Sequence, residues 1–272
     1  MGNEISMMVF VSLVCVAAGI SAVVAAGEWR ELPVAGLVRA GEASAALLLL
    51  GFLAVMFSLG RPEAFFGMLG NPGSAFFPVV ILSGLAFASL AGFCVAHFRG
   101  AEAPVTRFFA AAAGLLALAL AFAAGKTLVM PWREPWNTLT IPAAFLLWAA
   151  ACGLTAARAF LPEGAERLGK PLALAAAGLS AAGVLAYLAV ILSSETLRED
   201  GTAFAPLAGD QALLFWTGVV AAGIASPLIL ALKGRPGRKT AFAALVCAAI
   251  GIAAFHAVLY QLGMPAWHFF EN

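Results

Sequence analysis

Eight uninterrupted apolar segments, each close to 20 residues long, dominate this sequence and are separated by short polar stretches. A helix rises 1.5 Å per residue, so about 20 residues cross a hydrocarbon core of roughly 30 Å. Strands of a membrane barrel would alternate polar and apolar residues, which these segments do not. The pattern predicts an all-α integral membrane protein, with eight transmembrane helices in one bundle and a single domain over residues 1–272. The expected spans are about 5–26, 43–60, 75–97, 105–125, 138–160, 171–193, 210–232 and 239–262.

Charged residues are scarce, which supports this interpretation. The chain is 63% hydrophobic and 11% charged, whereas soluble domains average about 25% charged residues. The formal net charge of +1 comes with no basic stripe, so a nucleic-acid partner is not expected. The first apolar segment follows an acidic rather than a basic start, Met1–Glu4, and exceeds the length of a signal-peptide core. We therefore expect it to remain in the protein as a helix.

The Lys and Arg residues are divided unevenly between the two sets of loops. The odd loops and their flanks carry eleven cations, and the even loops carry four. Short loops rich in Lys and Arg stay in the cytoplasm, so both termini are predicted on the outer (periplasmic) side. The first set is Arg30, Arg39, Arg99, Arg107, Arg158, Arg167, Lys170, Lys233, Arg235, Arg238 and Lys239; the second is Arg61, Lys126, Arg133 and Arg198.

Metal and haem sites are not predicted in this chain. The four cysteines all lie inside apolar segments, without a CxxC or Cys/His cluster, and are expected to be buried thiols. Haem held by two histidines requires a pair at matching depth on different helices. His97 is at the inner end of the third span, where we expect it to face the head groups, and His256 is near the outer end of the eighth. The two histidines therefore differ in depth and do not form such a pair.

Two stripes of small residues suggest helix contacts in the last two spans. Small residues let helix backbones approach closely in lipid, although an alanine-rich sequence also produces such stripes by chance. Pro227 lies deep in the seventh span and should kink it. The stripes, at steps of four residues, are Gly218, Ala222 and Ser226, and Ala243, Cys247 and Gly251.

Polar residues inside the spans gather at the outer end. Ser58 and Arg61 end the second span, and His256 and Tyr260 share one face of the eighth. Both spans run from inside to outside, so we expect the four at similar depth, covered by loops 60–74 and 126–137. A quinone head group requires hydrogen-bond partners near the membrane surface, an apolar slot for its tail and a route for protons to water. This arrangement predicts such a site.

Each of these residues also has a purely structural interpretation. His256 could be an interior histidine bonded to a backbone carbonyl, and Arg61 could be an interfacial cation or a partner contact. Tyr260, like Trp132 and Trp136, could anchor the protein in the aromatic belt of the membrane. The sequence leaves these alternatives open.

Three short motifs occur in order along the chain. The first stretch is 54–62 (AVMFSLGRP), continuing into 71–75 (NPGSA) and the pair Ser83-Gly84. The second is 136–142 (WNTLTIP) with Phe145. The third joins Gly251 to 258–260 (VLY) and 262–264 (LGM). These motifs resemble the DmsC family, the membrane anchor subunits of dimethyl sulfoxide reductase-type molybdopterin oxidoreductases, and eight spans, external termini and total length are also similar to that family.

The resemblance implies a membrane anchor in the bacterial cytoplasmic (inner) membrane. Such anchors oxidise menaquinol and pass its electrons to an iron–sulfur subunit and on to a molybdopterin catalytic subunit in anaerobic respiration. Menaquinone is then the bound substrate, and the iron–sulfur clusters and molybdopterin belong to the partners. We expect the partners to dock on the outer face, on the second, fourth and sixth loops. The quinol-binding residues expected here are His256, Tyr260, Ser58, Arg61 and Trp136.

The chain departs from the family pattern at three positions. Ser58 stands where the family commonly has a histidine tied to quinol binding, and Val80 stands where it has an acidic residue. His256 stands where the family's C-terminal motif has an arginine. Either His256 has taken over the protonatable role at the same end, which we favour, or quinol chemistry is altered or lost.

The two alternatives to a quinol-oxidising anchor are a purely structural tether and a small-molecule transporter. A purely structural tether would need no protonatable site. A small-molecule transporter usually has charged residues near its span midpoints or paired broken helices, and neither pattern occurs here. The terminal electron acceptor of the complex, the direction of electron flow and the oligomeric state are not encoded in this chain.

Overall fold

A computed structural model describes residues 2–58, 67, 70–161, 169–233 and 237–263, except for the side chains of residues 2–4, 57 and 58. Within these ranges the structure contains eight helical segments long and apolar enough to cross a membrane, which confirms the predicted fold class. They are α1 (Gly2–Trp29), α2 (Val34–Ser58), α4 (Phe77–Phe98), α5 (Ala103–Lys126), α6 (Thr140–Phe160), α8 (Gly169–Ser193), a composite seventh segment and α13 (Arg238–Gly263). The seventh comprises α11 (Ala212–Leu214), the π-helix η3 (Phe215–Ala225) and α12 (Ser226–Lys233).

The second span begins well before its predicted start. The sequence placed it at residue 43 because Arg39 and Glu42 were assigned to a loop, but α2 is already helical at Val34, directly after Pro33. The Arg39 side chain folds back onto its own helix, where Nε donates to the carbonyl oxygen of Ala35 at 2.9 Å. The helix therefore continues through these charged residues and is longer than the hydrocarbon core requires.

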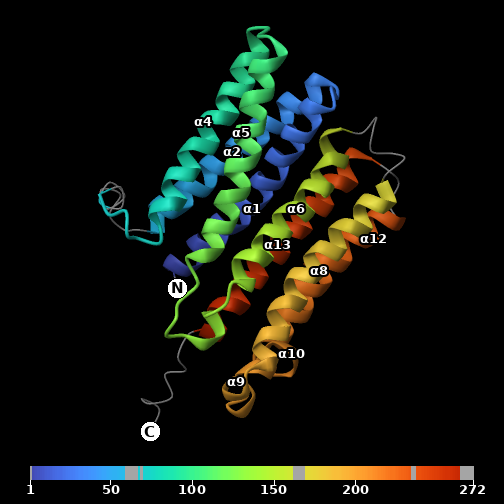
Figure 1. Ribbon diagram of the computed structural model, residues 1–272. Helices are drawn as coiled ribbons and strands as arrows, with labels where there is room; N and C mark the ends of the chain where they lie inside the picture. The colour runs from blue at the N-terminus through green and yellow to red at the C-terminus, as the bar shows by residue number, and fades with distance from the viewer. Residues whose placement is uncertain (1, 59–66, 68–69, 162–168, 234–236, 264–272) are drawn as a thin grey trace.

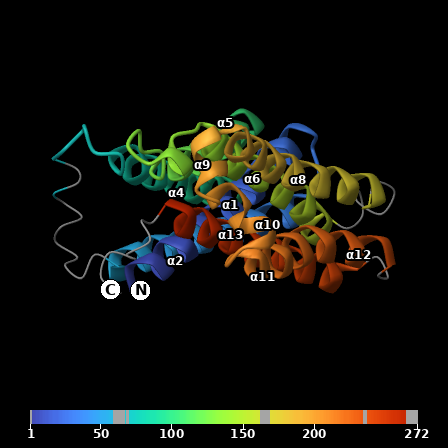
Figure 2. The same ribbon diagram turned by 90° about the horizontal axis from the view of Figure 1, so that it is seen from below.

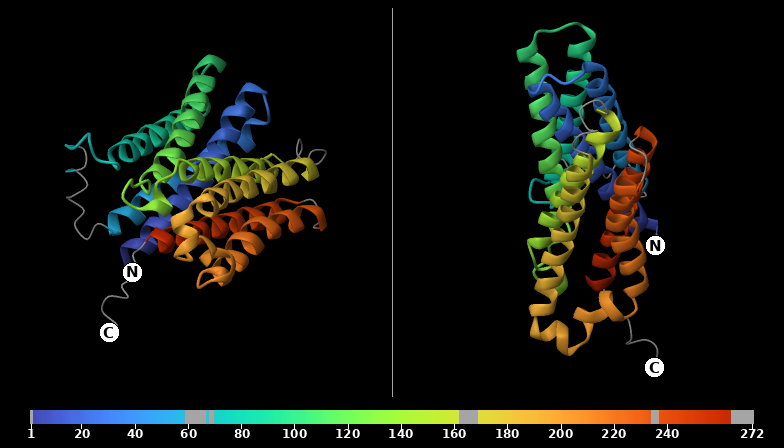
Figure 3. Two further views of the ribbon diagram at one scale, coloured as in Figure 1. Left: turned by 60° about the horizontal axis from the view of Figure 1, so that its bottom comes forward. Right: turned by 90° about the vertical axis from the view of Figure 1, so that its right-hand side faces the viewer.

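The eight segments form two groups of four. Helices α1, α2, α4 and α5 pack together, and so do α6, α8, the seventh segment and α13 (Figures 1 and 3). The groups meet where α1 and α5 contact α6, and where α1 also contacts α13. Gly2 and Gly263 lie at the same end, together with α9 (Glu195–Glu199) and α10 (Ala205–Ala208) (Figures 1 and 2). We call this end the outer end, following the charge asymmetry of the loops.

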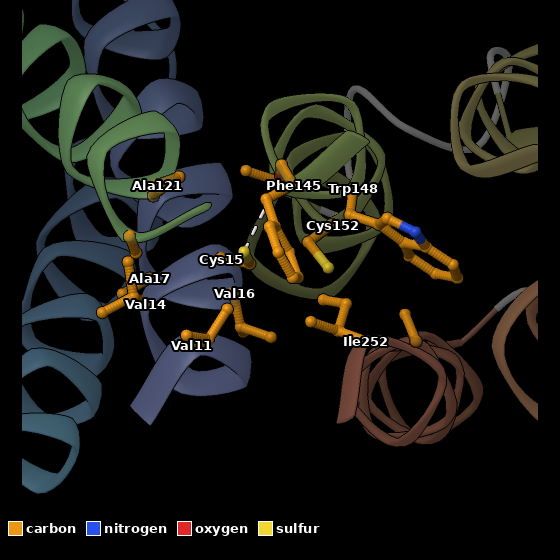
Figure 4. Packing of buried hydrophobic residues seen from close by; sticks show 14 of the residues in the cluster. Val11, Val14, Cys15, Val16, Ala17, Ala121, Phe145, Trp148, Cys152 and Ile252 are labelled. Atoms are coloured by element: carbon orange, nitrogen blue, oxygen red, sulfur yellow. Dashed lines mark hydrogen bonds between the residues drawn. The ribbon is translucent and has the colours of Figure 1, made fainter. Parts of the chain in front are cut away.

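The two groups approach most closely where α1 crosses α6. A Cβ atom on Gly153 would lie 2.8 Å from the carbonyl oxygen of Gly19, and one on Gly19 would overlap the backbone of α6. Cys15 lies one turn from Gly19, and its thiol donates to the carbonyl oxygen of Phe145 at 3.7 Å (Figure 4). Cys15 and Cys152 are fully buried here and free, as the sequence predicted, whereas Cys94 and Cys247, predicted to be buried as well, are only half-buried. Small residues thus permit the contact that joins the groups.

The predicted stripe of the seventh span is confirmed at Gly218 but not at Ala222, because the span is partly a π-helix. Within η3 the residues that share the face toward α13 are five apart, Gly218 and Gly223. A Cβ atom on Gly218 would lie 2.5 Å from Cβ of Ala254, and one on Gly223 would lie 2.6 Å from Cα of Gly251. Ala222, which a four-residue step would place in the contact, is only half-buried. The wider turn ends just before Pro227, where an α-helix would lose a hydrogen bond.

His97 does not face the head groups, in contrast to the prediction. Its Nε2 lies 3.1 Å from Oε2 of Glu28, and the hydroxyl of Thr106 donates to Oε1 of Glu28 at 2.5 Å. Glu28 is only 9% exposed. The three side chains tie the inner ends of α1, α4 and α5 together, and the buried carboxylate is satisfied by the two partners.

Candidate functional site

The loop between α5 and α6 wraps around the outer end of α13. It contains the short 3₁₀ helix η1 (Glu134–Trp136), which begins directly after Arg133 and includes Pro135. We call residues 133–136 the loop-four clasp. Pro135 sits in the first turn of η1, where its missing N–H costs no hydrogen bond.

Trp136 is a structural part of this clasp. Its side chain is buried, and its indole Nε1 donates to the carbonyl oxygen of Leu259 on α13 at 2.6 Å. Its ring centroid lies 5.9 Å from that of Tyr260, which is half-buried. Trp132 in the same loop is 77% exposed. The aromatic-belt interpretation therefore fits Trp132, whereas Trp136 faces into the protein.

Arg133 closes the end of α13. Its Nη1 donates to the carbonyl oxygen of Gly263, and its guanidinium lies 4.9 Å from the centre of the Trp136 ring. The last carbonyl groups of a helix carry partial negative charge, so a cation there is favourable. The Trp136 ring packs so closely on Gly263 that a Cβ atom at that position would overlap it. The sequence marked Arg133 only as a loop cation.

The clasp is also tied to the sixth loop. The hydroxyl of Ser194 bonds to Oε1 of Glu134, and the hydroxyl of Tyr187 on α8 donates to the carbonyl oxygen of Pro135 at 3.1 Å. Ser194 is in addition the N-cap of α9, where its hydroxyl accepts from the amide of Leu197 at 3.2 Å. Loops four and six therefore form one connected surface at the outer end.

His256 lies one turn inward from Tyr260 on α13. Its side chain is 1% exposed, and its ring centroid is 5.7 Å from that of Phe145 on α6. Neither ring nitrogen has a hydrogen-bond partner. The interior location agrees with the structural interpretation of this histidine, but the backbone carbonyl bond that the interpretation required is absent from the described contacts. The imidazole is thus beneath the clasp rather than on the surface.

Three of the five predicted residues, His256, Tyr260 and Trp136, lie together in the structure. Ser58 ends α2, whose main packing partner is α1, and α1 also packs against α13. Only the backbone of Ser58 is described, and Arg61 lies outside the described residues, so their place in the site stays a prediction.

A groove runs along α2 and α4, next to the outer end of α2. It encloses about 530 Å³ and lies within the size range of ligand sites in proteins. The Ser83 hydroxyl donates to the carbonyl oxygen of Val79 in its own helix at 2.7 Å, so the groove wall is apolar. The lining residues are Leu48, Leu49 and Phe52 of α2, and Val80, Ile81, Ser83, Gly84, Leu85 and Phe87 of α4.

A comparison with protein families matches nearly the whole chain. The model described as Polysulphide reductase, NrfD covers residues 2–264. The chain belongs to the NrfD family. A search of curated proteins finds no match.

NrfD proteins are polytopic membrane subunits of molybdoenzyme-type reductases, and they work with iron–sulfur and molybdopterin-type subunits. Family membership therefore agrees with the predicted multi-pass membrane anchor. The narrower resemblance to DmsC anchors stays a prediction.

Two features of this NrfD chain were missed by sequence reasoning: the tie between Arg133 and Gly263, and the groove. The spacing of Arg133 and Trp136 was a weak signal for the tie to Gly263. The groove was missed because Val80, Ser83 and Gly84 were only motif positions in the sequence, and the sequence does not show that their helix packs beside α2.

Proposed function

We propose that this chain is the membrane anchor and quinol-oxidising subunit of an anaerobic respiratory reductase. It passes electrons from menaquinol to an iron–sulfur subunit and, through that subunit, to a molybdopterin catalytic subunit. The observation that carries the proposal is the NrfD match over residues 2–264, a family whose members work with such partners. The DmsC-like motifs favour the narrower assignment, and they favour the bacterial cytoplasmic membrane with both termini outside.

The proposed quinol site is at the outer end. Tyr260 and Trp136 form an aromatic pair there, with His256 one turn inward. Groups that orient a ligand near a surface are typical of such sites. Ser58, which ends α2, remains a proposed ligand of the quinol, and so does Arg61, which lies outside the described residues. A quinol site also requires an apolar slot for the isoprenoid tail. The groove between α2 and α4 suits such a tail, because its wall is apolar and offers no free hydrogen-bond donor to a head group.

The partner subunits are proposed to dock on the surface made by loops four and six. The charged residues of α9 and its end, Glu195, Arg198, Glu199 and Asp200, are exposed there. Such residues suit the polar rim of a protein interface. Quinol is the substrate in this proposal, and the chain itself supplies hydrogen bonds and a protonatable imidazole. The described residues contain no cluster of three metal ligands.

A structural tether without quinol chemistry is the second candidate. It is favoured by the apolar or weakly polar residues Val80 and Ser58 at the positions where the resembling family has protonatable groups. It is also favoured by the deep burial of His256. A tether would still hold the iron–sulfur subunit at the membrane.

The two candidates differ in one measurable activity. The whole complex, purified with its partner subunits, should oxidise a reduced menaquinone analogue if the chain is a quinol oxidase. A viologen dye that feeds electrons directly to the partners measures their activity without this chain. The substitution His256→Ala should lower quinol-driven turnover while dye-driven turnover stays constant. Dye activity without any quinol activity in the wild type would favour the tether.

A further inference from the structure

His256 has a strongly polar ring in a place where no described residue offers it a hydrogen-bond partner. Both ring nitrogens are buried, and the ring centroid lies 5.7 Å from that of Phe145. A buried polar group left unsatisfied keeps the full cost of its removal from water. Native proteins normally avoid this cost by binding an internal water at such groups.

A second unpaired group occurs on the neighbouring helix. Nε1 of Trp148 on α6 is buried, and no described residue forms a hydrogen bond with it. Trp148 lies one turn inward from Phe145 on α6 (Figure 4). The far edge of its ring packs against Gly223 and Gly251. The contact between α6 and α13 therefore contains two polar groups that only a small polar molecule can satisfy.

The surroundings of His256 contain few other groups that exchange protons. Helix α1 between residues 5 and 27, α6 between 140 and 157, and the seventh segment between 212 and 232 carry no Asp, Glu, Lys or Arg. The other titratable side chains of these packed segments, of α8 between 171 and 193 and of α13 between 240 and 263 are the thiols of Cys15, Cys152 and Cys247 and the phenols of Tyr187 and Tyr260. The loop-four clasp, which also packs against α13, adds Arg133 and Glu134 at the outer end. Among these side-chain types, histidine is the one that changes charge most readily between pH 5 and 8.

We propose that His256 binds an internal water and, through it, accepts a proton released at the outer end, without touching the quinol itself. The inference rests on the proposed function and assigns His256 the role of a positioning residue. Oxidation of the quinol to the quinone breaks two O–H bonds and releases two electrons and two protons. The electrons leave for the iron–sulfur subunit. One proton passes to the internal water, which transfers a proton to a ring nitrogen of His256, and the other proton leaves directly to the water at the outer surface. The nearest polar side chain outward on the same helix is Tyr260, which marks the direction of exchange.

Hydration can be measured without any quinol. Synchrotron radiolysis generates hydroxyl radicals from bound water, so buried side chains beside such a water are oxidised. In the intact protein we expect oxidation of Phe145 and Phe255 to exceed that of Phe10, which is also buried but packs against Gly51 of α2 rather than beside His256. The substitution His256→Leu should lower their oxidation to the level of Phe10. Equal labelling of all three in the wild type would overturn the inference.

The proton role requires a second measurement on the whole complex. His256→Gln keeps hydrogen-bonding capacity but removes the protonatable ring. We expect kcat for quinol oxidation to fall at least about tenfold, with KM changed less than about twofold, and the pH dependence of kcat to lose one ionisation. An unchanged pH profile in this variant would overturn the proton role. If the wild type oxidises no quinol, the proposed function fails, and the labelling result alone decides whether His256 is hydrated.

Discussion

The indole N–H of Trp136 donates to the carbonyl oxygen of Leu259 at 2.6 Å, and this bond attaches the loop after α5 to the last helix of the bundle. The substitution Trp136→Phe removes the bond and leaves a buried carbonyl with one partner fewer. We expect a loss of about 1–2 kcal/mol in unfolding free energy, measured by thermal denaturation in detergent. Trp132→Phe is the matched control in the same loop, and it should change the melting temperature little, because Trp132 is exposed. Equal effects from both would contradict the role of the clasp.

The crossing of α1 and α6 should tolerate no side chain at Gly19. A Cβ atom there overlaps the backbone of Gly153 and Ala149, so the helices must separate. We expect Gly19→Ala to destabilise the protein by at least about 1–3 kcal/mol, as overpacked cores do. The measurement is the monodisperse fraction in size-exclusion chromatography after heating. Gly178→Ala, where nothing lies within 4 Å of the new Cβ, should behave as the wild type.

The buried carboxylate of Glu28 should matter more than the exposed carboxylate of Glu31. Glu28→Ala leaves the His97 ring without its carboxylate partner, and the Thr106 hydroxyl keeps only its bond to the carbonyl oxygen of Ala103. We expect a loss of about 1.5–3 kcal/mol, because hydrogen bonds to a buried charged group are removed. Glu31→Ala breaks an ion pair with Arg107, but Glu31 is 79% exposed, so the loss should be below about 1 kcal/mol. Thermal denaturation of the two variants in the same detergent tests the order.

Filling the groove between α2 and α4 should weaken the binding of long-tailed quinols but not of tailless ones. Gly84 lines the groove, and nothing lies within 4 Å of a Cβ atom there, so Gly84→Leu fills space without moving the backbone. If the tail occupies the groove, KM for a long-tailed quinol should rise, by less than about tenfold because lipid is an equally apolar alternative. A tailless analogue should be unaffected.

Gly178→Leu is the control for that experiment, because Gly178 also has open space around it but lies on α8. A rise in KM for both quinols, or for the control variant, would place the tail elsewhere.

The charge asymmetry predicts the orientation of the bundle. A fluorescent protein inserted after Gly100, between α4 and α5, should fluoresce, because that loop is predicted in the cytoplasm. Alkaline phosphatase inserted after Gly201, between α9 and α10, should be active, because that loop is predicted outside. The opposite pattern would reverse the orientation and place the clasp at the cytoplasmic face.

The number and approximate ends of the membrane helices could be predicted because segment length and hydropathy depend on local sequence alone. The start of α2 was misplaced because Arg39 and Glu42 were taken to mark a loop, although a helix can continue past charged residues at the membrane surface. The contact face of the seventh span was misplaced because a four-residue step does not hold in a π-helix.

The candidate site was predicted only in part, for reasons of packing. The shared face of His256 and Tyr260 follows from helical spacing, and the structure brings Trp136 to the same helix. The ring contact that helps to bury His256 is made by Phe145, which lies on another helix and more than 100 positions earlier in the chain. Ser58 was grouped with His256 by depth, but depth does not specify which helices are neighbours.

The position of α1 has a consequence for biosynthesis. It is the most buried of the eight described spans and the first to leave the ribosome, yet α6 and α13, which cover one side of it, are made later. The surface around Gly19 must therefore stay exposed to lipid, or to the insertion machinery, until residue 153 has been translated. Exposure of small apolar residues to lipid costs little free energy. The composition of this helix therefore suits both its early synthesis and its buried place in the finished bundle.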